Sequence, residues 1–256
     1  MRSAFKSQIK KILKRFDIAI TKQSHLEQLQ RESRASNVIN LLREQPERPD
    51  RQLLDLSQHS RSQFGQDLFA LQQSGFRKNG YFVEFGATNG LDLSNSFLLE
   101  EEFAWSGILA EPARRWHKEL RANRTCHIET DCVWSESNSH ITFEEADWGE
   151  LSGVRVAPAS DTKSKGRTYT VNTISLLDLL NKYSAPKEID YLSIDTEGSE
   201  FDILSSFDFS KYQFNVITCE HNHEPRRENI FSLLTANGYV RKFEAISGCD
   251  DWYVRG

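Results

Sequence analysis

The chain has 256 residues, of which 38% are apolar and 27% charged, and its formal net charge is −5. This length and composition suit one large domain or two small ones with a substantial core, and they exclude a chain that is disordered throughout. No apolar run approaches the roughly 20 residues that span a bilayer, and Lys and Arg interrupt the N-terminal stretch too often for a signal peptide.

The net charge is divided unevenly along the chain. Residues 1–22 contain seven basic residues against one acidic residue, whereas the rest contains 25 basic against 36 acidic residues. A body with a charge of −11 repels nucleic acid, which excludes a protein that coats DNA or RNA non-specifically. We therefore expect no nucleic-acid partner.

Residues 1–50 are predicted to form a helical arm that ends near Pro46 and Pro49. In its first helix the apolar residues recur at three- and four-residue steps, with the basic groups beside or opposite them. Two hypotheses fit residues 1–45. The arm lies as a basic amphipathic helix on an anionic membrane surface, or it packs on its own domain or on a second subunit.

From residue 62 onward, short apolar runs alternate with segments of helical period. Strands are predicted over residues 81–85, 106–110, 126–128, 189–194 and 214–219, and helices over 93–103, 112–122, 175–183, 200–206 and 226–237. This alternation predicts a parallel sheet with helices on both faces. Ser175 is a plausible N-cap, residues 146–168 are predicted to be a long mobile loop, and residues 239–254 a terminal β-hairpin.

The four cysteines form no C-x-x-C pair, and their spacing to the histidines fits no structural zinc pattern. We therefore favour reduced, buried thiols in a cytoplasmic protein over a zinc site. The cysteines are Cys126, Cys132, Cys219 and Cys249.

A predicted strand ends at residue 85 in a glycine turn that opens a helix. Open α/β sheets bind ligands beyond the carboxyl ends of their strands, where the chain order reverses. Gly86 and Gly90 would let the backbone approach such a ligand, although both also suit an ordinary turn. Glu84 suits a cationic group such as the amino group of a methionine moiety, and Glu111, at the next strand end, suits ribose hydroxyls. Together they indicate an adenosyl ligand.

Acidic residues also follow the next two strands along the chain. Because neighbouring strand ends lie about 5 Å apart, Asp195, Glu220 and one of His221 or Asn222 are predicted to converge over the sheet. This donor set suits Mg²⁺ or Mn²⁺. Without a metal, Asp195 or His221 would instead take a proton from an acceptor hydroxyl. The glutamates of residues 197–200 alternatively cap the following helix.

Several of these motifs, in the same order, resemble the FkbM-type S-adenosylmethionine-dependent methyltransferases. They are Ser62-Gln63-Phe64-Gly65-Gln66-Asp67, residues 82–90, Ser94-Asn95, residues 107–112, residues 194–200 and residues 250–254. The resemblance leaves out the first ~60 residues. It implies a class I methyltransferase fold, which is an α/β, Rossmann-like and mostly parallel sheet that ends in a C-terminal antiparallel hairpin. It also implies O-methyl transfer, commonly to sugar or polyketide hydroxyls.

The resemblance further implies which residues bind S-adenosylmethionine. Glu84, Gly86 and Gly90 would hold its methionine end, Glu111 its ribose, and Asp131-Cys132 would lie beside its adenine. Asn89 stands where the family commonly has an acidic residue. The other implied cofactor contacts are Ala87, Asn89, Ser94, Asn95, Pro112 and Gln66. The catalytic assignment of Asp195, Glu220 and His221 rests on the residues themselves.

We therefore expect a methyltransferase domain over residues 51–256 that methylates a hydroxyl of a sugar or glycan. Basic residues of the 146–168 loop would suit a phosphorylated or lipid-linked acceptor. The alternatives are a non-catalytic binding or scaffold member of the same fold, and an NAD-dependent oxidoreductase. Glu84 argues against the oxidoreductase, because it replaces the first glycine of the dinucleotide fingerprint. The expected location is cytoplasmic, with peripheral contact at the inner face of the membrane through the arm.

Overall fold

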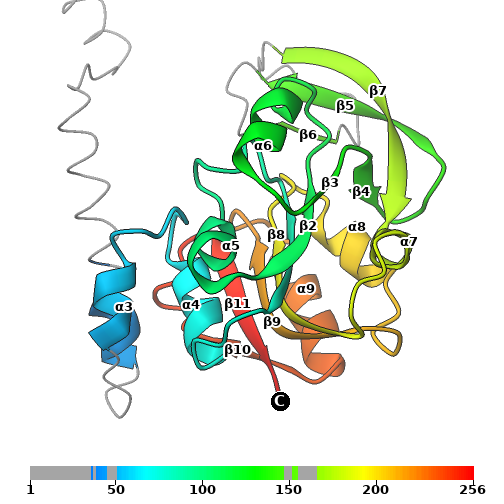
Figure 1. Cartoon of the computed structure of the whole chain (residues 1–256). Coiled ribbons are helices and arrows are strands. Elements are labelled where there is room, and N and C mark those ends of the chain that lie inside the picture. The colour runs from blue at the N-terminus through cyan, green and yellow to red at the C-terminus, as the bar shows by residue number, and fades with distance from the viewer. Residues whose placement is uncertain (1–35, 37–38, 45–50, 147–151, 155–165) are drawn as a thin grey trace, which may run out of the picture.

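The computed structural model describes residues 36, 39–44, 51–146, 152–154 and 166–256. A large sheet of seven strands and a small sheet of four form its framework (Figure 1). The large sheet contains β1 (Tyr81–Phe85), β2 (Ser106–Ala110), β3 (His127–Glu129), β8 (Glu188–Ile194), β9 (Gln213–Glu220), β10 (Tyr239–Lys242) and β11 (Asp250–Arg255). Its strand order is β10-β11-β9-β8-β1-β2-β3.

The five strands from β3 to β9 are parallel, and β1 lies between β2 and β8. The chain order therefore reverses at β1. The last two strands form the predicted antiparallel hairpin, in which β11 pairs with both β9 and β10. The sequence prediction of a mostly parallel sheet that ends in an antiparallel hairpin is confirmed.

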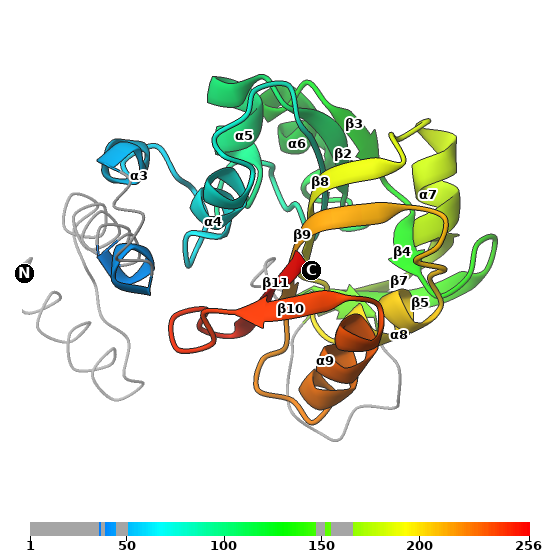
Figure 2. The same cartoon turned by 90° about the horizontal axis from the view of Figure 1, so that it is seen from below.

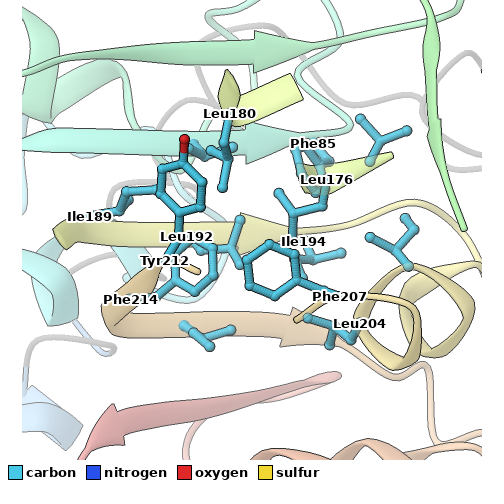
Figure 3. Packing of buried hydrophobic residues seen from close by; sticks show 14 of the residues in the cluster. Phe85, Leu176, Leu180, Ile189, Leu192, Ile194, Leu204, Phe207, Tyr212 and Phe214 are labelled. Carbon is cyan, nitrogen blue, oxygen red and sulfur yellow. The ribbon is translucent and has the colours of Figure 1, made fainter. Parts of the chain in front are cut away.

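Helices cover both faces of the large sheet (Figure 2). They are α4 (Gln66–Gln73), α5 (Phe97–Phe103), α6 (His117–Asn123), α7 (Leu176–Lys182), α8 (Glu200–Ser205) and α9 (Arg227–Ala236), whereas α3 (Arg51–Leu56) packs against α4. Successive strand residues face opposite ways, so Phe82 packs with α4 and α5 while Val83 packs with α7, α8 and α9. Figure 3 shows the second of these cores, in which Phe85, Leu192 and Ile194 meet Leu176 and Leu204.

Local chemistry explains where two of the helices begin. The Ser175 side chain accepts a hydrogen bond from the Asp178 N–H at 3.1 Å, so the predicted N-cap of α7 is confirmed. The helix predicted from residue 93 begins only at Phe97, because Ser94 and Ser96 donate their hydroxyls to Glu84 instead of continuing a helix.

The prediction of one long loop over residues 146–168 is wrong for its described parts. A small sheet of order β4-β7-β5-β6 is built around it. Its strands are β4 (Cys132–Trp134), β5 (His140–Ala146), β6 (Gly153–Val154) and β7 (Gly166–Ser175). β5 and β7 pair antiparallel from His140↔Asn172 to Ala146↔Gly166.

Part of the predicted arm contacts the domain. Leu41, in the described segment 39–44, is fully buried in the same cluster as Leu53 of α3. The amphipathic stripe predicted in residues 1–22 lies outside the described residues. The prediction of buried thiols holds for Cys132 and Cys219, whereas Cys126 and Cys249 are half-buried. Among the described residues, none of the helices is long and apolar enough to cross a membrane.

Candidate active site

A cavity opens at the carboxyl ends of β1, β2 and β8, where the chain order reverses. In open α/β sheets this is the expected place for a ligand. Phe143 of β5 and Val154 of β6 line its opposite side, so the small sheet covers the cavity. The described residues that line it include acidic but no basic side chains, and its carboxylates are Glu84, Asp92, Glu111, Asp195 and Glu197. Such a site favours a ligand that carries positive charge.

Gly86, directly after β1, lets two strand ends meet at the cavity. Its φ is +77°, and a Cβ atom at this position would lie 1.9 Å from the carbonyl oxygen of Asp195. Any side chain here would therefore push the β1 and β8 exits apart. Gly90 is also left-handed, with a φ of +77°, but an added Cβ would meet only side chains of α6 and Arg124.

Glu84 is buried and held by three donors from the segment before α5. Its carboxylate accepts hydrogen bonds from the hydroxyls of Ser94 and Ser96 and from the Asn95 N–H at 2.8 Å. Arg124 in turn donates to both hydroxyls, at 3.1 and 2.9 Å. The predicted site residues Glu84, Ser94 and Asn95 are thus brought together, and Glu84 is fixed at the cavity wall.

Glu111 connects the loops that follow β1 and β2. Its two carboxylate oxygens accept hydrogen bonds from the backbone N–H groups of Thr88 and Ala113, each at 2.7 Å. Burial raises its pKa to about 7, and the nearby carboxylates of Asp195 and Glu145 act in the same direction. A cationic ligand in the cavity would stabilise its ionised form.

The other predicted cofactor residues divide into two groups. Asn95, Pro112 and Cys132 line the cavity. Residues of the second group support it from behind and do not line it: Ala87, Asn89, Gly90, Ser94, Asp131 and Gln66. Asn89, for example, accepts from the Asp92 N–H at 2.9 Å and donates to its carboxylate at 2.8 Å, so it closes the turn.

Asp195 and Glu220 meet above the sheet, as the strand order predicts, and the third group is Glu197. Carboxylate oxygens of these three residues lie within 4.8 Å of one another. Burial raises the pKa of both Asp195 and Glu220, and their mutual repulsion raises that of Glu220 further. Burial and the neighbouring carboxylates raise the pKa of Glu197 to about 7.

The structure places His221 and Asn222 apart from this cluster. The His221 Nε2 atom lies 3.8 Å from the Asp251 carboxylate, and its Nδ1 atom accepts from the His223 N–H at 2.9 Å. Burial lowers its pKa. Asn222 reaches the cluster only by donating to Glu197 at 3.3 Å. The described oxygen set that fits a divalent cation is therefore Asp195, Glu197 and Glu220.

Asp250 is a site-adjacent carboxyl to which the sequence assigned no role. It is paired with Glu220 across β11 and β9, and it accepts a hydrogen bond from the Gln66 amide at 2.8 Å. Burial and Asp195 raise its pKa to about 7. Gln66 thus contacts Asp250, which neighbours the strand-end carboxyls, and does not line the cavity itself. The alternation of Ile141 and Phe143 with polar residues is the signal that could have identified β5.

Comparison with known families and structures places these features in context. A family model for the methyltransferase FkbM domain matches residues 84–242. No curated protein matches the chain.

Solved methyltransferase structures match at low identity. The Geobacter metallireducens precorrin-6y C5,15-methyltransferase is 10% identical with a TM-score of 0.39, over 73% of this chain and 85% of that chain. The Lactobacillus delbrueckii ribosomal protein L11 methylase is 8% identical with a TM-score of 0.38, over 74% and 76%. The METTL16 methyltransferase domain is 9% identical with a TM-score of 0.41, over 73% and 64%.

Proposed function

Because the chain belongs to the FkbM methyltransferase family, in which S-adenosylmethionine is the cofactor, we propose that it methylates a hydroxyl group of a sugar or glycan. The observation that carries this proposal is the Asp195 carboxylate, which lines the same cavity as Gly86 and Glu84 and lies within 4.8 Å of the Glu220 carboxylate. A sugar hydroxyl is a weak acid, so its methylation requires a group that takes its proton.

The cavity suits S-adenosylmethionine. The lining carboxylates complement a cation, and Gly86 lets the backbone after β1 lie close to that of Asp195 at the cavity wall. Glu84 would hold the amino group, Glu111 the ribose hydroxyls, and Pro112, Cys132 and Phe143 would contact the adenine. When bound, the cofactor supplies an electrophilic methyl group with a neutral leaving group.

The protein then has two tasks, which are positioning and proton transfer. Asp195 is the proposed base for the acceptor hydroxyl. The neighbouring Glu220, whose pKa is also raised, would orient the Asp195 carboxylate and limit the charge of the pair. Phe143 and Val154 would keep water from the reacting groups. His221 faces Asp251, so its proposed role is confined to supporting the strand end.

A methyl-transfer screen tests this function. Full-length protein is incubated with labelled S-adenosylmethionine and with nucleotide sugars, lipid-linked glycans or purified polysaccharides. Transfer to a carbohydrate oxygen supports the proposal. Binding of S-adenosylmethionine without transfer to any carbohydrate would favour a non-catalytic scaffold or another acceptor, and failure to bind it would reject the cofactor assignment.

A divalent cation is a second candidate for activating the acceptor. The three carboxylates of Asp195, Glu197 and Glu220 favour Mg²⁺ or Mn²⁺ over softer metals. The cation would lower the pKa of a bound hydroxyl, and Asp195 would then be a ligand instead of a base. Unchanged turnover after chelation, with no gain on adding Mg²⁺ or Mn²⁺, would reject the cation and leave the base.

For the N-terminal arm we propose contact with an anionic membrane surface, which would place a cytoplasmic enzyme at the inner face of the membrane. The seven basic residues in positions 1–22 support this proposal, and self-association is the alternative. Sedimentation with anionic vesicles compares the full chain with one that begins at Asp50. Equal sedimentation would reject membrane contact, and equal oligomeric state would reject self-association.

A further inference from the structure

A second hollow lies outside the cofactor cavity, and its lining residues come from the loop before α6 and from the β5–β7 ladder. We call it the basic hollow. Its lining residues are Arg114, Arg115, Glu145, Arg167, Thr168 and Tyr169. Three guanidinium groups against one carboxylate give it a formal charge of +2, whereas the whole chain has −5. This local excess of positive charge stands out on an acidic protein.

The ladder register and an aromatic contact build the hollow. Glu145 and Arg167 are cross-strand partners, and Phe143 and Tyr169 are the partners two residues further along the same face. The guanidinium of Arg114 lies 4.3 Å from the centre of the Tyr169 ring. This cation–π contact orients a planar donor group toward the hollow.

Two of the arginines retain donor capacity. A guanidinium has five N–H groups, and the described side-chain bond of Arg114 is one contact to the Thr170 carbonyl at 3.3 Å. Arg167 is exposed and makes no ion pair with any described residue. The Glu145 carboxylate is engaged, because it accepts from the Tyr169 hydroxyl at 2.8 Å. Uncompensated, planar donors of this kind match phosphate oxygens.

The basic hollow shares a wall with the cofactor cavity. The rings of Phe143 and Tyr169 are 5.8 Å apart, and Phe143 lines the cavity. The Tyr169 hydroxyl also lies 3.5 Å from the Pro112 carbonyl, and Pro112 lines the cavity as well. A molecule that reaches from one site to the other therefore crosses a single layer of side chains.

We propose that the basic hollow binds a phosphate group of the acceptor, so that the acceptor is a phosphorylated sugar or a glycan on a phosphate carrier. The acidic cavity would repel such a group, whereas the hollow attracts it. The two sites would thus set the orientation of the acceptor. The identity of the ligand as the acceptor rests on the proposed function, but phosphate binding by the hollow does not.

Calorimetry on the full chain tests the site without turnover. Inorganic pyrophosphate and glucose 1-phosphate are the soluble probes, and phosphatidylcholine vesicles with and without polyprenyl phosphate are the membrane probe. We expect Arg114→Gln and Arg167→Gln each to weaken binding about tenfold, as for the loss of one charge-assisted contact. Arg255→Gln is the matched control, because Arg255 is exposed on β11, away from the hollow.

The outcomes separate the two proposals. Binding that is lost in the hollow variants and kept in Arg255→Gln supports the inference. Tighter binding of the soluble probes or of the polyprenyl phosphate vesicles then tells whether the phosphate is soluble or lipid-linked. Equal binding by all variants, or none by the unaltered protein, overturns it, whatever the methyl-transfer screen gives. Affinity for S-adenosylmethionine checks the folding of each variant. Arg167→Gln removes no described contact and should therefore fold. It still tests phosphate binding if Arg114→Gln misfolds.

Discussion

The cofactor cavity and the basic hollow are neighbours, but their charged groups differ in sign and in burial. The cavity takes its charge from carboxyls at the ends of central strands, among them the buried Glu84 and Glu111 and the half-buried Asp195. The hollow takes its charge from exposed arginines such as Arg114 and Arg167, on a loop and an edge ladder. Burial fixes a group's position and strengthens its interactions, whereas exposure leaves it screened by water and salt. Substitutions in the cavity should therefore reduce activity and stability much more than substitutions in the basic hollow.

The largest expected effect is on catalysis. Asp195→Asn keeps the size of the side chain but removes the carboxylate that would take the acceptor proton. We expect kcat to fall by about 10²–10⁴-fold, the usual contribution of a general base. The Kd for S-adenosylmethionine should change only a few-fold. Quenched methyl-transfer assays measure kcat, and calorimetry measures the Kd for S-adenosylmethionine.

Asp202→Asn is the matched control for this substitution. Asp202 lies on α8, only a few residues from Asp195, but pairs with Arg226 at 2.6 Å on a partly exposed surface. Its loss should leave kcat within about twofold, since such pairs contribute little. Equal losses of kcat in both variants would remove Asp195 from the catalytic step.

The next effect is on stability. An alanine at position 86 would place its Cβ atom 1.9 Å from the Asp195 carbonyl in a left-handed conformation. We expect Gly86→Ala to lower the free energy of unfolding by about 3 kcal/mol or more, from strain and overpacking together. Binding of S-adenosylmethionine should be lost with it. Urea denaturation measures the difference.

Gly238→Ala separates strain from contact. Gly238 has a φ of +86°, but no atom lies within 4 Å of an added Cβ. Only the left-handed strain of about 1 kcal/mol should remain. If Gly86→Ala and Gly238→Ala lower the free energy of unfolding equally, the close contact between the β1 and β8 exits does not contribute to stability.

The comparison also explains which features the sequence predicts. β1 and β2 were predicted over residues 81–85 and 106–110, and the structure places them there. Central strands buried on both faces appear as near-continuous apolar runs bounded by turns, so their ends are well defined. Because topology brings those ends to one edge, the convergence of Asp195 and Glu220 follows from the pattern.

Features set by local geometry could not be predicted in the same way. His221 follows Glu220 directly, but successive residues at a strand end point to opposite sides, so His221 faces Asp251. Glu197 has a φ of +56° and its side chain lines the cavity, whereas the sequence suggested for it only a cap of the following helix. The β5–β7 ladder is half exposed and rich in polar residues, so its apolar signal is weak.

A smaller effect is expected on the pH dependence of stability. The pKa values of Glu111, Glu197 and Asp250 are each raised to about 7, mainly by burial. The unfolded chain loses these protons near pH 4 to 5, while the folded chain keeps them until about pH 7. Stability should therefore be highest below that window and fall as the pH rises through it.

Urea denaturation between about pH 5 and 8 measures this profile. Saturating S-adenosylmethionine should flatten it, because a bound cation favours the ionised carboxyls. Asp251 has the opposite sign: ion pairs with Arg227 and Arg241 lower its pKa, so its contribution is lost only in acid. A profile that stays flat without the cofactor would show that the carboxyls ionise freely in the folded protein.

The smallest expected effects are on the stability and the salt dependence of the basic hollow. Arg167→Gln should change the free energy of unfolding by less than about 0.5 kcal/mol, as at other exposed sites. Raising the salt concentration from about 0.05 to 0.5 M should weaken pyrophosphate binding severalfold, because exposed charges are screened over a few ångströms at high salt. The Kd for S-adenosylmethionine should change less, since buried carboxylates are screened less. If both affinities had the same salt dependence, burial would not be what distinguishes the two sites, and the charge of the whole chain would govern both.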